Sequence, residues 1–270
     1  MNNKTKKAVT DFITNELQLE IKSLPFIENG ISNFNFLLNN RYVIKYKDSR
    51  LDLRNSASNE LNMSNALNKL GKTPLHSFYQ NFVVIDYLEN TKFLDKNNYK
   101  LHLCSLVNLI QTVHNLPSDN FQVFDPFQRL NFYKSQTGKG FELIGEEQTL
   151  NEAAKYYLEA KKVPCHNDLV NGNILIKDDE LYLIDFEYCG LNDPDFDVVS
   201  FLSENDFVDT TVKLEFLDCY YQGQAPIEKL SSYFALANLL WYYWALYAYQ
   251  KTKKAIFIEI AQNKKLQYLA

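Results

Sequence analysis

The sequence predicts an α+β fold in two lobes, a small lobe built on an antiparallel sheet (residues 1–90) and a larger, mainly helical lobe (residues 91–270). Short runs rich in β-branched and aromatic residues fill the region before residue 90, which is typical of strands. After residue 90, apolar residues recur at the helical period. A single hairpin of two strand-like runs interrupts this helical part at residues 173–184. A chain of 270 residues that is 46% hydrophobic can bury a sizeable core.

The small lobe begins with a predicted helix at residues 6–19, whose apolar side chains form one stripe: Val9, Phe12, Ile13 and Leu17. Strands are predicted at residues 24–27, 34–38 and 42–46. Asn39-Asn40 predicts a tight hairpin turn between the last two, because Asn tolerates positive φ. Residues 75–78 and 82–85 are expected to complete the sheet.

A helix is predicted between these strands, from about Asn55 to Leu70. Its expected inner face consists of Leu61, Ala66, Leu67 and Leu70. Gly71 fits the position that ends such a helix, where a left-handed residue is favoured.

The large lobe is predicted to contain amphipathic helices at residues 99–116 and 150–162 and an aromatic helix that includes residues 238–247. Its hairpin has strands at residues 173–176 and 181–184, joined by the polar turn Lys177-Asp178-Asp179-Glu180. A hairpin brings the residues at its open end together. We therefore expect Asp168, Asn173 and Asp185 to converge.

Three converging oxygen-bearing side chains suit a hard cation such as Mg²⁺. The spacing H-x-D-x-x-x-x-N from His166 to Asn173, followed by D-F-E from Asp185, matches the catalytic pattern of phosphoryl transfer. In that pattern Asp168 accepts the proton of the attacking hydroxyl, and Asn173 and Asp185 hold metal ions. Asp and Asn are also common in ordinary surface turns, but the complete spaced set favours the functional interpretation.

The residues HNDLVNGNILI, followed by LIDFEYCGLNDPDFDVVSF, are similar in identity and spacing to the signature of the choline/ethanolamine kinase family. The closer likeness is to bacterial LicA-type choline kinases, within the aminoglycoside-phosphotransferase and protein-kinase-like group. The resemblance covers roughly residues 28–248. It implies a bilobal protein-kinase-like fold and a reaction of ATP, with Mg²⁺, that phosphorylates the hydroxyl of choline.

For the nucleotide, the resemblance implies a loop of the G-x-(S/T)-N type that provides Gly30, Ser32 and Asn33. An ordinary turn is the alternative. Lys45, in a V-I-K strand, is implied to reach the phosphates, unless it lies on the solvent face of an edge strand. Glu60 is the candidate partner of Lys45, with an exposed helix Glu as the alternative. A third metal ligand is expected from Glu187, beside Asn173 and Asp185.

For the acceptor, Trp241 and Trp244 lie three residues apart on one helix face and could form an aromatic cage for a quaternary ammonium. An aromatic stripe of this kind is otherwise core, but choline kinases carry W-x-x-W at the corresponding place. Glu204 is implied to face the cationic headgroup. Tyr220 or Tyr242 is the candidate for completing the cage.

Other polar residues near the motif are assigned supporting parts. His166 is expected to pack beneath the catalytic loop, and the resemblance implies that Asp197 braces the loop backbone. Asp193 and Asp195 are interpreted as solvated turn residues, and His114 as a surface or packing residue.

Composition excludes other classes. The net charge of −5 and pI near 5.5 argue against a nucleic-acid partner. The four cysteines lie far apart and predict neither a zinc site nor a disulfide framework. No signal peptide and no run of about 20 apolar residues is evident, so we expect a cytoplasmic protein without membrane insertion. No pattern predicts an oligomeric state.

Two kinds of rival function remain. Ethanolamine, thiamine or an aminoglycoside could replace choline as the acceptor. A nucleotide-binding pseudokinase is a rival of another class, disfavoured because every acid–base and metal position is filled. A protein kinase is also disfavoured, because no A-P-E segment follows Asp185-Phe186-Glu187.

Overall fold

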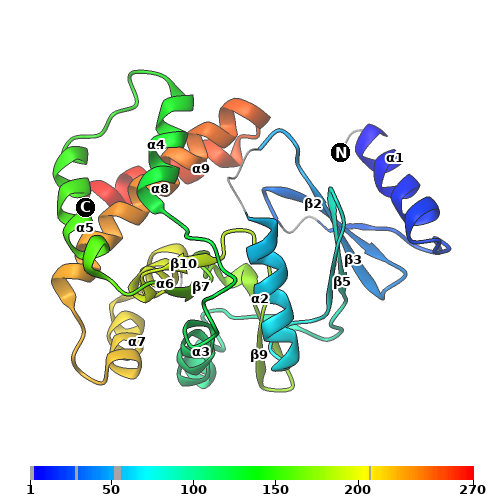
Figure 1. Ribbon diagram of the computed structural model, residues 1–270, viewed down its shortest axis with the longest axis horizontal. Coiled ribbons are helices and arrows are strands. Elements are labelled where there is room, and N and C mark those ends of the chain that lie inside the picture. Colours follow the sequence, from blue (N-terminus) through cyan, green and yellow to red (C-terminus); the bar gives the residue numbers. More distant parts are fainter. Residues whose placement is uncertain (1–2, 28–29, 52–55, 207) are drawn as a thin grey trace.

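A computed structural model describes residues 3–27, 30–51, 56–206 and 208–270. It has the predicted bilobal kinase-like fold, with a sheet in the N-terminal part and helices around a small hairpin in the C-terminal part (Figure 1). The helix α2 (Ala57–Lys69) lies between the sheet and the helical part (Figure 1). No helix among the described residues is long and apolar enough to cross a membrane.

The N-terminal sheet is fully antiparallel, in the order β1-β2-β3-β5-β4. Its strands are β1 (Phe26–Ile27), β2 (Asn33–Leu38), β3 (Tyr42–Lys47), β4 (His76–Phe78) and β5 (Phe82–Asp86). Asn39 and Asn40 have φ of 54° and 52°, so the predicted turn between β2 and β3 is confirmed.

The predicted N-terminal helix is present, but it ends earlier than expected, and it packs against this sheet. The α-helix α1 (Asn3–Asp11) continues into a π-helical turn at Phe12–Glu16. Val9, Phe12 and Ile13 are buried in one cluster with three residues of β2 and β3: Phe36, Leu38 and Ile44. The apolar stripe read from the sequence therefore forms the core of the small lobe.

The inner face predicted for α2 is largely wrong. Leu61 and Leu70 are 41% and 52% exposed, whereas Leu67 is buried as predicted. The other buried positions are Asn59, Glu60, Met63 and Ser64. This face is polar because α2 meets loop backbone of the large lobe, where Asn59 donates to the carbonyls of Gln122 and Cys189, each at 3.0 Å.

The large lobe is organised around α8 (Ile227–Thr252), which packs against α4, α5, α6 and α9 (Figure 1). The helices of this lobe are α3 (Tyr99–His114), α4 (Pro126–Thr137), α5 (Glu146–Glu159), α6 (Pro194–Glu204), α7 (Thr210–Tyr221), α8 and α9 (Ile256–Leu269). The aromatic stretch at residues 238–247 is buried in the middle of α8.

The predicted hairpin is present as β8 (Ile174–Lys177) and β9 (Glu180–Leu183). Asp178 and Asp179 have positive φ, as a tight two-residue turn requires. The short strand β6 (Lys92–Phe93) pairs with the other edge of β8. A second pair of strands consists of β7 (Val163–Cys165) and β10 (Gly190–Asn192). It holds together the segment just before the loop at residues 166–173, called the catalytic loop, and the segment just after the hairpin.

Candidate active site

The mouth of the hairpin brings the predicted catalytic side chains together. A turn of 3₁₀ helix at Asn171–Asn173 folds the chain back. The side-chain nitrogen (Nδ2) of Asn173 therefore donates two hydrogen bonds to Asp168. It lies 2.9 Å from the main-chain oxygen of Asp168 and 3.0 Å from its carboxylate. The Ile184 amide donates to the Asn173 carbonyl at 3.0 Å, which places Asp185 directly beside them.

Asp168 has an unusual environment for a carboxylate. Burial raises its pKa well above the usual value, and the negative charges of Asp185, Glu204 and Glu187 raise it further. The hydrogen bond from Asn173 acts in the opposite direction but is the smallest of these contributions. Asp168 is therefore a stronger proton acceptor than an exposed aspartate.

Lys45 is buried at the active site and does not lie on a solvent-facing edge. Its ammonium lies 2.5 Å from Asp185 and 3.4 Å from Glu187. Burial alone would lower the pKa of Lys45, but the charges of Asp185 and Glu187 overcome this and hold it above the usual value. Asn33 of β2 donates to the same Glu187 carboxylate at 2.8 Å. Two neighbouring strands thus supply side chains to one acidic pair.

Glu60 is buried, but it does not contact the lysine expected from the sequence. Its carboxylate lies 2.6 Å from the ammonium of Lys47, while Lys45 contacts Asp185 and Glu187. The two lysines are two residues apart on β3 and so share one face of the sheet. Because residues two apart on a strand point to the same face, the sequence pattern does not indicate which of the two lysines contacts Glu60 of α2. The predicted Glu60–Lys45 pair is corrected to Glu60–Lys47.

The predicted phosphate loop lies partly outside the described residues, which exclude Glu28 and Asn29. Gly30 has φ of 107°, a conformation that favours glycine. Ser32 and Asn33 are buried. The carbonyl of Ile31 accepts a hydrogen bond from the Lys254 ammonium at 2.8 Å. A lysine between α8 and α9 therefore ties this loop to the large lobe, a contact that local sequence patterns did not indicate.

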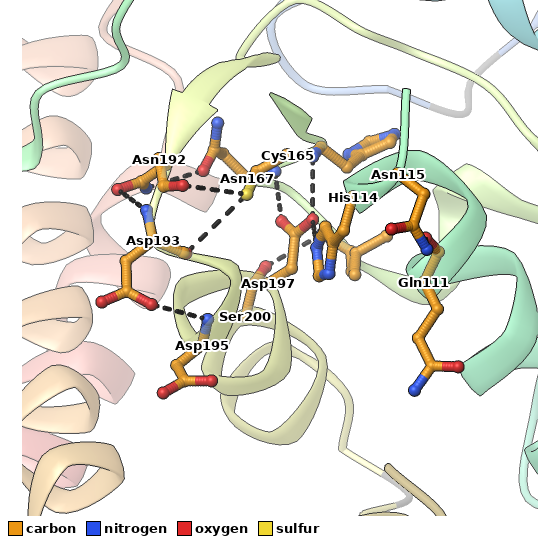
Figure 2. Close-up of polar contacts among 12 residues, drawn as sticks. Gln111, His114, Asn115, Cys165, Asn167, Asn192, Asp193, Asp195, Asp197 and Ser200 are labelled. Atoms are coloured by element: carbon orange, nitrogen blue, oxygen red, sulfur yellow. Dashed lines mark hydrogen bonds and ion pairs between the residues drawn. The ribbon is translucent and has the colours of Figure 1, made fainter. Parts of the chain in front are cut away.

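Asp197 braces the catalytic loop, as the resemblance implied (Figure 2). The amides of His166 and Asn167 donate to its two carboxylate oxygens at 2.9 and 2.6 Å. Nε2 of His114, on α3, is hydrogen-bonded to the same carboxylate at 3.0 Å, and its Nδ1 is hydrogen-bonded to the Tyr220 hydroxyl at 2.9 Å. Asn167 has φ of 65°, so these bonds hold a backbone conformation that is uncommon for a non-glycine residue.

Asp193 and Asp195 were predicted to be solvated turn residues, and this is wrong. Asp193 is fully buried, caps α6 and accepts from the Tyr233 hydroxyl at 2.6 Å. Lys229 lies 2.8 Å from both carboxylates. Asp193 is buried because it caps the start of α6, which the large lobe encloses. Its buried charge is compensated by the ammonium of Lys229 and the hydroxyl of Tyr233, both from α8.

The residues predicted for the acceptor lie in one aromatic cluster. Trp241 and Trp244 contact edge-to-face at 5.8 Å between ring centroids, and Tyr188 contacts Trp241 at 5.1 Å. Tyr188, which immediately follows Glu187, was missed. The two tyrosines expected to complete the cage have other partners. Tyr220 bonds to His114, and the Tyr242 hydroxyl donates to the carbonyl of Phe141 at 3.0 Å.

Glu204 lies close enough to Asp168 for its negative charge to contribute to the raised pKa of that carboxyl. Its carboxylate is not free, however. Lys264 of α9 contacts it at 2.6 Å. Lys264 was not predicted, because it lies beyond residue 248, where the family resemblance ends.

The acidic residues fit a divalent cation. Burial raises the pKa of Glu187 to about 7, and the charge of Asp185 contributes to this rise. One ammonium group, that of Lys45, contacts the two carboxyl groups of Asp185 and Glu187, so this group of three side chains can carry a net negative charge. Because the Asn173 nitrogen is used on Asp168, its oxygen is the atom suited to a metal. Carboxylate and amide oxygens are the ligands that Mg²⁺ prefers.

Comparison with known proteins identifies the family. Residues 23–229 match the model of the phosphotransferase enzyme family. LicA of Haemophilus influenzae is 28% identical over 248 residues, which cover 82% of this chain and 73% of that protein. A crystal structure of choline kinase LicA from Streptococcus pneumoniae is similar with a TM-score of 0.81 at 21% identity, covering 99% of each chain.

The likeness extends to a nucleotide complex. The GDP complex of aminoglycoside 2′-phosphotransferase-IIIa is similar with a TM-score of 0.71 at 17% identity, covering 98% of this chain and 99% of that one. These structural likenesses establish the fold. Since the family match spans most of the sequence and includes the hairpin with Asp168, Asn173 and Asp185, the chain belongs to the phosphotransferase enzyme family.

Proposed function

We propose that this protein is an ATP-dependent kinase that phosphorylates the hydroxyl of choline. The observation that carries the proposal is the meeting of Asp168, held by Asn173, with the Lys45–Asp185 pair at one hairpin mouth. This arrangement supplies a proton acceptor, a phosphate-binding cation and metal-binding oxygens in one place. The similarity to LicA supports choline as the acceptor.

In this proposal the small lobe, residues 1–90, holds the nucleotide. Lys45 binds phosphate oxygens, and its ion pair with Asp185 keeps its side chain in place on β3. The loop with Gly30, Ser32 and Asn33 contributes backbone and polar groups along the phosphates. Asn33 also orients Glu187 through their hydrogen bond. Glu60 acts one step further away by fixing Lys47 beside Lys45.

Asp168 receives the proton of the acceptor hydroxyl. Its raised pKa makes it a better base, and the hydrogen bond from the Asn173 side chain to its carboxylate fixes the direction in which it presents its oxygens. Asn173, Asp185 and Glu187 would hold Mg²⁺, which when bound neutralises charge on the phosphate groups. Because phosphoryl transfer needs little covalent chemistry from the protein, positioning by these residues is the main contribution.

The large lobe, residues 91–270, holds the acceptor in this proposal. Trp241, Trp244 and Tyr188 offer aromatic faces and edges within one contact network, and aromatic faces attract quaternary ammonium groups. Glu204 supplies a negative charge near Asp168. The hydroxyl and the cationic end of one small amino alcohol could thus be held together.

The test is ADP release from Mg²⁺-ATP in the presence of choline, ethanolamine, thiamine or an aminoglycoside, with Asp168→Asn as the blank. A choline-selective signal supports the proposal. Activity that prefers another acceptor would keep the kinase and remove choline as its substrate. Binding of ATP without turnover of any of the four would favour the pseudokinase alternative.

A further inference from the structure

Lys264 occupies a position where a lysine is not expected. It lies on the inner face of α9 with Phe257 and Ala261, at the i, i+4, i+7 spacing of a buried helical stripe. Only 5% of Lys264 is exposed, and its two companions are buried apolar residues. Burying an ammonium is costly unless it is paired, so the position calls for a specific partner.

The partners of Lys264 form a complete set for an ammonium group. Its three hydrogens are matched by three oxygens, belonging to Glu204 at 2.6 Å, Gln267 at 3.1 Å and the Ser203 carbonyl at 3.3 Å. Glu204 is the one charged member. The lysine therefore neutralises the carboxylate that the proposed function assigns to the cationic end of the acceptor.

The same helix also borders the tryptophan cluster. Phe257, seven residues before Lys264, contacts Trp244 edge-to-face at 5.4 Å between ring centroids. The inner face of α9 thus contacts Trp244 through Phe257 and Glu204 through Lys264. The negative charge of Glu204 in turn acts on Asp168, the proposed base.

We propose that Lys264 is a specificity-determining residue of the acceptor site, an internal counter-ion with which a cationic acceptor must compete for Glu204. The inference rests on the proposed function, because it concerns the acceptor of that reaction. In the resting protein Glu204 is already paired, so the positive charge of the acceptor gains less from this carboxylate than it would from an unpaired one. The lysine thereby limits the preference for charged over neutral alcohols.

The matched pair of acceptors is choline and 3,3-dimethylbutan-1-ol, which keeps the hydroxyl and the shape but replaces the ammonium nitrogen by carbon. The test variant is Lys264→Met, which keeps an unbranched apolar stem and removes the charge. Lys264→Gln is the second variant and retains hydrogen bonding. Lys264→Arg preserves the charge, and Lys265→Met alters an exposed neighbour on the same helix.

We expect Lys264→Met and Lys264→Gln to lower the KM for choline about tenfold, a size typical of a close charge pair. The KM values for ATP and for the neutral alcohol should change little. Lys265→Met should behave like the wild type. Lys264→Arg should keep the wild-type ratio of the KM values for the two alcohols, because it keeps the charge beside Glu204. Combining Lys264→Met with Glu204→Gln should abolish the gain, because the freed carboxylate is its cause.

A binding measurement accompanies the kinetics. Choline should raise the Tm of Lys264→Met more than that of the wild type, because at one ligand concentration tighter binding stabilises the folded state more. An equal change in KM for both alcohols, or a higher KM for choline, would overturn the proposal and leave Lys264 a purely structural residue. If the wild type phosphorylates neither alcohol, the proposed function fails. If it phosphorylates choline and the ratio is unchanged in the variants, only the inference about Lys264 fails.

Discussion

Asp168 and Asp185 lie at the mouth of the same hairpin, yet their surroundings shift their pKa values in opposite directions. Burial raises the pKa of both, but the charge and hydrogen bond of Lys45 bring the pKa of Asp185 below its usual value. No cationic side chain among the described residues pairs with Asp168, which receives the repulsion of three carboxylates. Two aspartates with pKa values moved apart suit two different tasks, proton acceptance and cation binding.

Asp168→Asn should therefore lose turnover while it keeps nucleotide binding. We expect kcat to fall by at least about a hundredfold, the usual contribution of a general base. ADP release measures turnover, and the rise in Tm with ATP measures binding. Asp178→Asn, in the turn at the far end of the hairpin, is the control. An equal loss of binding and turnover in Asp168→Asn would contradict the assignment of Asp168 as the base.

His76 should make the fold sensitive to acid. Burial lowers its pKa from 6.5 to about 4, and the charge of Lys45 adds to this. The unfolded chain binds a proton more readily than the folded one, so stability is full above pH 6.5 and is lost as the pH falls towards 4. Between pH 7 and pH 5 we expect a loss of about 2 kcal/mol from this group.

Urea denaturation of the wild type and of His76→Gln at both pH values measures this contribution. The variant should lack that part of the pH dependence, while other titrating groups affect both proteins alike. A parallel pH dependence in the two proteins would show that His76 does not titrate in this range.

At the scale of single elements, the start of α4 shows how a short motif determines a helix end. The carboxylate of Asp125 accepts from the amides of Phe127 and Gln128 at 2.9 and 3.0 Å, and Pro126 occupies the first turn. This is the pattern of a capped helix start with proline at the first position. The helix it begins packs against α8, which carries both tryptophans.

Asp125→Ala should destabilise the protein by about 1 kcal/mol, the typical value of a helix cap. Asp125→Asn retains an acceptor oxygen and should lose much less. Denaturant unfolding of both variants measures the difference. Equal losses would mean that the charge of Asp125, rather than its hydrogen bonds, stabilises this end of α4.

The elements also show where sequence patterns were sufficient. The turns at Asn39-Asn40 and Asp178-Asp179 were predictable because few residues accept their positive φ. The inner face of α2 was not predictable from hydropathy, because that face meets backbone carbonyls of the large lobe and uses Asn59 for them. The partner of Glu60 depended on where a helix crosses a strand, which no local spacing encodes.

At the scale of the whole molecule, the fold and the convergence of the side chains at the hairpin were predictable, but the contacts between distant segments were not. Asp168, Asn173 and Asp185 lie within one stretch of the chain, and Asn173 and Asp168 meet as their spacing predicted. Lys254 and Lys264 come from the far end of the sequence, and only the packing of α9 against α8 brings them to the site.

Lys254 should support nucleotide binding from the large lobe. Lys254→Met removes the hydrogen bond to the Ile31 carbonyl. We expect the KM for ATP to rise about threefold to tenfold, the size typical of one intramolecular hydrogen bond, with the acceptor KM nearly unchanged. Steady-state kinetics with each substrate varied in turn measures this, and Lys251→Met on the exposed face of α8 is the control. A rise confined to the acceptor KM would contradict this placement of Lys254.

The bracing of the catalytic loop by Asp197 has a consequence for amide hydrogen exchange. The amides of His166 and Asn167 belong to a loop, but they donate to a fully buried carboxylate. Their exchange with deuterium requires Asp197, and with it the start of α6, to move away. These two loop amides should therefore exchange as slowly as core helix amides, and their exchange rate reports the opening of the large lobe rather than local loop motion.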